Sequence, residues 1–181
     1  MTQPKFEPLI LPRGVRPTRA DEVPGEADPE LLARMAAARL LTEYVLAAPP
    51  APAGYAAFLE ANVHAPRMWN VFRELAEALL PDIAAPIVGV KGEETLLGPC
   101  TERAAALDAL QAHQKALEQD GFLEFGVIFQ YEGRTEEVFV RSPKYLQIWT
   151  SKVEVAEAVL QRHGVIRTEE LQFVDELPIV G

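Results

Sequence analysis

Three consecutive runs rich in β-branched and aromatic residues lie between Gly121 and Thr150, and they are the clearest pattern of apolar positions in the chain. In the first run one face is wholly apolar or aromatic, and it comprises Leu123, Phe125, Val127, Phe129 and Tyr131. Turn-forming residues separate the runs at Glu132-Gly133-Arg134 and at Ser142-Pro143. Runs rich in aromatic and β-branched residues with short turns between them are typical of adjacent antiparallel strands. The pattern therefore predicts a β-meander over residues 122–150.

Helices are predicted in other segments by apolar spacing, by capping residues and by flanking prolines. These segments cover residues 28–48, 55–62, 66–80, 101–120 and 151–163. At the start of the last one, Ser151 and Glu154 fit the capping box, in which each side chain accepts from a free backbone amide. Shorter runs predict additional strands over residues 87–90, 95–97 and 171–174.

The order of these elements predicts an α+β fold with a mainly antiparallel sheet, helices packed on it and an N-terminal helical segment. Residues 1–28 are rich in proline and poor in apolar side chains, so we expect a flexible N-terminal arm there. Residues 29–181 are expected to form a single α+β domain. Its helical part would cover 29–80, and its sheet part would cover 86–181.

The chain is strongly acidic, with 27 Asp and Glu against 17 Lys and Arg and a formal net charge of −10. Such a surface repels phosphate backbones, so we expect no nucleic-acid partner. It attracts a basic protein partner, with an association rate that falls as salt rises. Solubility alone is the alternative explanation of this charge.

Composition also indicates a compartment. The chain has one cysteine and therefore no intrachain disulfide, and it contains no apolar run of membrane-spanning length. Its first residues lack the apolar core of a signal peptide. We therefore expect a cytoplasmic protein with no membrane partner. Abundant alanine and the excess of arginine over lysine suggest a GC-rich bacterial gene.

No short motif of a nucleotide-binding or hydrolytic enzyme is present in the sequence. Cys100 is the best lone nucleophile, but His64, His113 and His163 are scattered, and no spacing brings one of them near it. The same scatter gives no metal-ligand pattern, so we expect no metal and no cofactor. Adjacent carboxylates such as Glu136 and Glu137 point to opposite faces of a strand and cannot form an acid/base pair by adjacency.

The last run of the meander provides the candidate binding site. If Leu146 and Ile148 are core residues, the opposite face of this strand displays a group of side chains that is typical of binding surfaces. The candidate binding residues are Arg141, Lys144, Tyr145, Gln147 and Trp149. The alternative is that helices cover both faces of the sheet and make the two aromatic residues part of the core.

Together these observations predict a non-enzymatic, acidic protein-binding module, of the kind found among toxin-neutralising (immunity-like) and chaperone-like proteins. Two other functions stay open. The first is an enzyme with a pocket built on Cys100, His64 and glutamates. The second is a structural protein that associates with itself, for example as a homodimer, through the same aromatic face.

Overall fold

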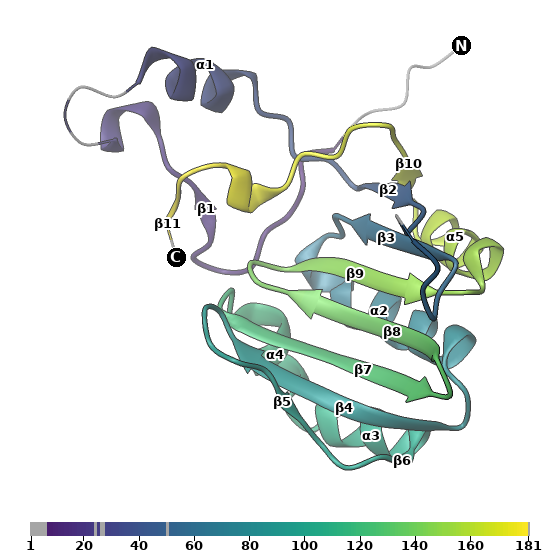
Figure 1. Ribbon diagram of the computed structural model, residues 1–181. Coiled ribbons are helices and arrows are strands. Elements are labelled where there is room, and N and C mark those ends of the chain that lie inside the picture. The colour runs from purple at the N-terminus through teal and green to yellow at the C-terminus, as the bar shows by residue number, and fades with distance from the viewer. Residues whose placement is uncertain (1–6, 24, 26–27, 50, 181) are drawn as a thin grey trace.

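The computed structural model describes residues 7–23, 25, 28–49 and 51–180. These residues form five α-helices and a mostly antiparallel sheet, which confirms the predicted α+β class (Figure 1). The helices are α1 Pro29–Ala37, α2 Ala65–Leu79, α3 Arg103–Gln111, α4 Gln114–Gln119 and α5 Val153–Arg162.

The main sheet has the strand order β10-β2-β3-β9-β8-β7-β4-β5, and β6 pairs with the first residues of β4. Its strands are β2 Glu43–Ala47, β3 Ala57–Ala61, β4 Ile83–Val90, β5 Leu96–Leu97, β6 Thr101–Glu102, β7 Leu123–Tyr131, β8 Arg134–Arg141, β9 Tyr145–Thr150 and β10 Ile166–Arg167. Every pairing is antiparallel except that of β10 with β2. The predicted meander is confirmed as β7, β8 and β9.

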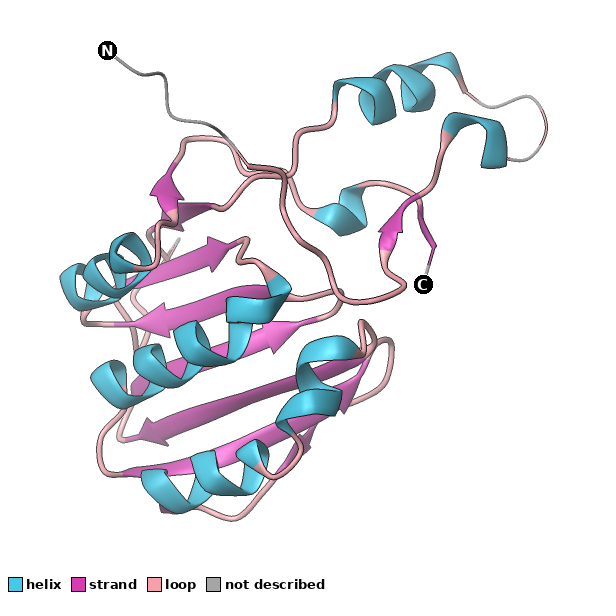
Figure 2. Cartoon of the chain, turned by 180° about the vertical axis from the view of Figure 1, so that it is seen from behind, coloured by secondary structure: helices cyan, strands magenta, loops and turns pink. Residues whose placement is uncertain are grey.

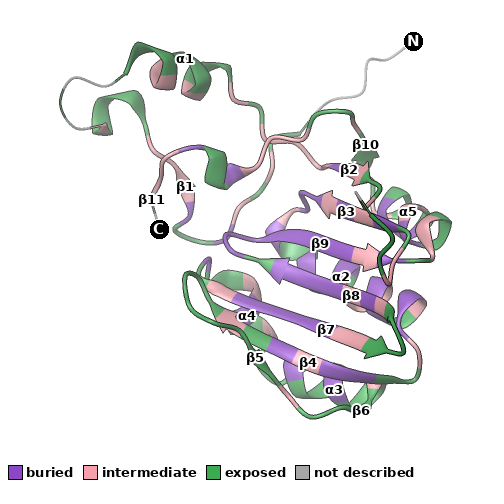
Figure 3. Cartoon of the chain, viewed as in Figure 1, coloured by how far each residue is buried: buried purple, intermediate pink, exposed green. Residues whose placement is uncertain are grey.

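Helices α2 to α5 all lie on one face of this sheet (Figure 2). The core fills the space between the two layers, and Figure 3 shows the buried centre of the sheet. At its middle the ring of Phe72 from α2 meets the ring of Phe125 from β7, with centroids 4.9 Å apart. Leu146 and Ile148 of β9 are fully buried in the same core, as the sequence predicted. None of the described helices covers the opposite face of the sheet (Figures 1 and 2).

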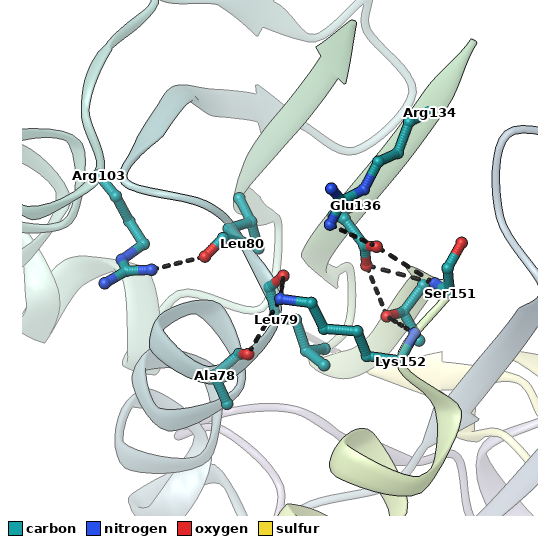
Figure 4. Close-up of polar contacts among 9 residues, drawn as sticks. Ala78, Leu79, Leu80, Arg103, Arg134, Glu136, Ser151 and Lys152 are labelled. Atoms are coloured by element: carbon teal, nitrogen blue, oxygen red, sulfur yellow. Dashed lines mark hydrogen bonds and ion pairs between the residues drawn. The ribbon is translucent and has the colours of Figure 1, made fainter. Parts of the chain in front are cut away.

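The end of α2 is joined to the helices on either side of it through its last carbonyl groups. The Nζ of Lys152 donates to the carbonyl of Leu79 at 2.7 Å, and Arg103 donates to the carbonyl of Leu80 (Figure 4). The last carbonyls of a helix have no partner within the helix, and cations are favourable there. Two side chains from distant segments thus cap α2 where Pro81 ends it.

The expected helical part over residues 29–80 is wrong in two places. The helix predicted over 28–48 ends at Ala37, and residues 43–47 form β2 instead. The short helix predicted over 55–62 is β3. The β3 sequence contains two alanines, which favour a helix, whereas β2 contains one alanine together with Tyr44 and Val45, which favour a strand. In both segments the structure is decided by strand pairing, of β2 with β3 and of β3 with β9.

Three boundaries nearer the carboxyl end also differ from the predictions. The helix expected over 101–120 is interrupted at Ala112 and His113, which separate α3 from α4. The strand expected over 171–174 is absent, because residues 171–173 are unpaired and Val174–Glu176 form a 3-10 helix. The predicted capping box is also wrong. The N-cap of α5 is Lys152, and the backbone amide of Ser151 donates to Glu136.

The predicted flexible arm over 1–28 includes residues 1–6, 24, 26 and 27, which lie outside the described part of the chain. Several of the arm's other residues are hydrogen-bonded to distant segments. Strand β1, Arg16–Pro17, pairs with β11, Ile179–Val180. The carbonyl of Ile10 accepts from the backbone amide of Ala65 at 2.8 Å, where α2 begins. These contacts hold the part of the arm between Leu9 and Thr18 against distant segments.

Candidate functional site

The face of the sheet opposite the helices, called the helix-free face below, carries a mixed row of side chains at its centre. Strand pairing places five residues side by side across β3, β9, β8, β7 and β4. They are Phe58, Trp149, Glu137, Ile128 and Ala85. The next row contains Glu60, Gln147, Phe139, Gly126 and Ile87. By alternation Glu43, Glu124 and Arg141 lie on the same face. Four carboxylates therefore share this face with one arginine.

Trp149 and Phe58 form an aromatic pair on this face. Their ring centroids are 4.9 Å apart, and both residues are half-buried. The other tryptophan of the chain, Trp69, is only 3% exposed and lies in the core under the helices. The indole of Trp149 is thus the one tryptophan surface that a partner can contact.

Four of the five predicted binding residues lie together on the helix-free face: Arg141, Tyr145, Gln147 and Trp149. Two of these four are more covered than the sequence indicated. Tyr145 is 7% exposed because the ring of Phe173 packs on its ring, with the two centroids 4.7 Å apart. Burial raises the pKa of Tyr145 to about 12. The side-chain amide of Gln147 donates to Glu60 at 2.9 Å. Trp149 and the exposed Arg141 are the accessible members.

Lys144 does not flank this face, and that prediction is wrong. It lies in the turn before β9 at a φ of 91°, and it is only 2% exposed. Its ammonium group donates to the carbonyl of Leu123 and lies 5.7 Å from the ring centroid of Phe125, on the helix side. Burial lowers its pKa to about 8. The helix-free face is therefore more acidic than the sequence suggested.

Glu136 and Glu137 point to opposite faces, as alternation predicts, and have different environments. Glu136 is fully buried on the helix side. Its carboxylate accepts from the hydroxyl of Thr150 at 2.6 Å and from the amide of Ser151 at 3.3 Å, and Arg134 lies 3.4 Å away (Figure 4). Glu136 thus fixes the connection between β9 and α5, which is a structural role.

Glu137 lies on the helix-free face between Trp149 and Ile128. Burial is the cause that raises its pKa from the ordinary 4.5 to about 7. Sequence alone indicates a solvated edge charge at this position and misses the burial of Glu137 between Trp149 and Ile128. The signal is present in the alternation, because Glu137 is the cross-strand neighbour of Trp149 once β8 and β9 pair.

We expect Glu137→Gln to stabilise the protein at high pH. Since the pKa is higher in the folded than in the unfolded chain, the folded state holds more protons between pH 4.5 and 7, and stability falls as pH rises through this window. The neutral amide avoids this loss, so the free energy of unfolding should rise by about 1–3 kcal/mol at pH 8 and change little at pH 4.5. Urea unfolding at both values measures the difference. Glu154→Gln, which removes one charge at an exposed position of α5, should show no such pH dependence. An equal gain of Glu137→Gln at both pH values would contradict the assignment.

A groove of about 820 Å³ continues the helix-free face beyond β3. One wall is formed by Glu43, Val45 and Ala47 of β2, and the C-terminal segment forms the other with Glu169, Glu170 and Glu176. Arg39 is the basic residue in its lining. The groove therefore adds carboxylates and an apolar floor next to Phe58 and Glu60.

The alternative site based on Cys100 is not assembled. Cys100 is exposed after β5, whereas His64 follows β3, and the sheet separates these two strands by five spacings, roughly 24 Å. His64 accepts from the amide of Ile10 at 2.9 Å, and His163 lies 2.6 Å from Glu74. Among the described residues no three His, Cys, Asp or Glu side chains are grouped to hold a metal ion.

None of the helices in the described ranges combines the length and apolar character that crossing a membrane requires. Comparisons with protein-family models, with curated proteins and with solved structures found no match. The candidate site is therefore defined by its own geometry: an aromatic pair and several carboxylates on the sheet face that no described helix covers.

Proposed function

We propose that this protein is a non-enzymatic protein-binding module that binds a basic partner through the helix-free face. The observation that carries this proposal is the half-buried Trp149–Phe58 pair, which lies among Glu60 and Glu137 on a face that no described helix covers. Toxin-neutralising and chaperone-like proteins belong to this functional class. The proposal places the protein in the cytoplasm, consistent with its single cysteine.

The energetics of binding favour such a face. Tryptophan beside other apolar side chains is the residue type that contributes most at protein interfaces, where its loss costs more than about 2 kcal/mol. Carboxylates around it add attraction for a cationic surface and accelerate encounter. The net charge of −10 acts in the same direction over longer range.

Self-association through the same face is disfavoured by its charge. A symmetric dimer places the same patch of each copy against the other. Glu60 and Glu137 of two copies would then meet with Arg141 as the counter-charge on this face. A partner of opposite charge avoids that repulsion, so we favour a basic protein over a homodimer.

A random peptide library displayed on phage tests the proposal before any partner has been identified. Peptides selected on the wild-type protein should carry a net positive charge and should lose at least about thirtyfold in affinity for Trp149→Ala. Tyr131→Ala is the matched control, since Tyr131 is an aromatic residue 63% exposed at the far end of β7. It should leave affinity unchanged. Selected peptides that are acidic, or that bind Trp149→Ala as well as wild type, would contradict the proposal.

A further inference from the structure

We propose that Trp149, Phe58 and Glu137 form a subsite for one lysine or arginine side chain of the partner. This inference rests on the proposed function and names the chemistry that the helix-free face recognises. It assigns a role to Glu137, an acid that the structural hydrogen-bond network of Glu136 does not use.

The geometry of the three residues suits a cation on an aliphatic stem. Glu137 is directly opposite Trp149 in the β8–β9 pair, and side chains in this relation have Cβ atoms about 4.5–5.5 Å apart. A cation stacked on the indole is therefore within reach of the carboxylate, and it gains both a cation–π contact and a charge pair. Phe58 on one side and Ile128 on the other provide apolar surface for the methylene groups of the stem.

The charges around Glu137 favour the same ligand. From β7 and β9 the neighbours that face it directly are Ile128 and Trp149, which are uncharged. Glu60 lies on β3 beyond Trp149, and Gln147 binds one of its carboxylate oxygens. Arg141 lies on the same face four residues from Glu137 along β8, and Glu124 lies four residues from Ile128 along β7, each roughly 13 Å along its strand. The charged group nearest to Glu137 on this face is thus the carboxylate of Glu60. A cation bound beside Trp149 is attracted by Glu60 and by Glu137.

Burial makes this subsite sensitive to pH near neutrality. With a pKa of about 7, the Glu137 carboxyl is largely neutral at pH 6 and largely ionised at pH 8. A cation binds the ionised form, so binding strengthens as pH rises and releases a proton near pH 7. The acidic groove along β2 lies three strands from β8, roughly 14 Å away. A partner segment with several basic residues can therefore occupy the subsite at Glu137 and this groove together.

Tetralysine amide and its fully Nε-acetylated form are the probes, and titration calorimetry at low salt is the measurement. Wild type should bind tetralysine at pH 8 about five- to tenfold more tightly than at pH 6, and the acetylated form should not bind measurably. Glu137→Gln should lose the same five- to tenfold at pH 8 and should bind almost equally at both pH values. Glu154→Gln matches it in net charge and should bind like wild type. Repeating the wild-type titration at pH 7 in buffers of different ionisation enthalpy reports the released proton.

The outcomes separate the two proposals. If Trp149→Ala loses binding but Glu137→Gln retains wild-type affinity and pH dependence, the cation subsite is wrong and the proposed function remains. If neither substitution changes tetralysine binding, both are wrong. The subsite is supported if Glu137→Gln loses affinity for tetralysine and its pH dependence, while Glu154→Gln binds tetralysine like wild type.

Discussion

Glu136→Ala is expected to lower the free energy of unfolding by about 3–5 kcal/mol. Its carboxylate is fully buried and accepts from Thr150 and Ser151, with Arg134 at its edge. Removing it leaves the hydroxyl of Thr150 and the amide of Ser151 without this acceptor, and it opens a cavity under the β9–α5 connection. The same connection carries Lys152, which caps α2, so the loss should reach beyond the immediate contacts.

The adjacent residue is the matched control for this experiment. Glu137→Ala removes the same atoms from the opposite face, where burial disfavours the charge, and it should change stability at pH 7 by no more than about 1 kcal/mol. Urea unfolding of both variants measures the contrast. Equal losses would show that the helix-free face is as tightly packed as the helix side.

Trp69→Ala is expected to lower the free energy of unfolding by about 3–5 kcal/mol. The indole of Trp69 is buried between α2 and the sheet, where it packs against Phe72 and Phe125. Trp149→Ala should cost about 1–2 kcal/mol, since only its contact with Phe58 and part of its burial are lost. Its main effect should be on binding. Thermal and urea unfolding of the two variants under one condition give the comparison.

A Trp149→Ala variant as unstable as Trp69→Ala would place Trp149 in the core and remove the basis for a binding face. Trp149 would then behave as a core residue, as in the alternative raised by the sequence, although no described helix covers this face. Unfolding data decide this before any partner is known.

The meander was predictable because its strands are rich in β-branched and aromatic residues and are bounded by turns at Gly133 and Pro143. Alternation also assigned Leu146, Ile148, Tyr145 and Trp149 to the correct faces. Strands β2 and β3 were not predictable, because the alanines of β3 favour a helix and the outer partners of this pair, β10 and β9, are distant in sequence. The capping box at Ser151 failed for a related reason: Glu136, fifteen residues away, binds the amide of Ser151.

The candidate site was predictable as a face but not as a set of accessible atoms. Burial of Tyr145 depends on Phe173, and Lys144 turns towards Leu123. Neither contact has a local signal in the sequence. Glu137 could have been found by pairing β8 with β9, whereas its shifted pKa follows from burial that only the assembled sheet shows.

Collisional quenching of Trp149 fluorescence tests most directly whether the helix-free face is open and acidic. The Trp69→Phe variant has Trp149 as its only tryptophan. Caesium and iodide ions both quench indole fluorescence by collision, and they carry opposite charges. At low ionic strength, caesium should quench Trp149 more efficiently than iodide, relative to a free tryptophan amide under the same conditions, because the nearby carboxylates concentrate cations. Glu137→Gln in this background should reduce that preference at pH 8. Absence of quenching by both ions, or stronger quenching by iodide, would contradict an accessible acidic binding face.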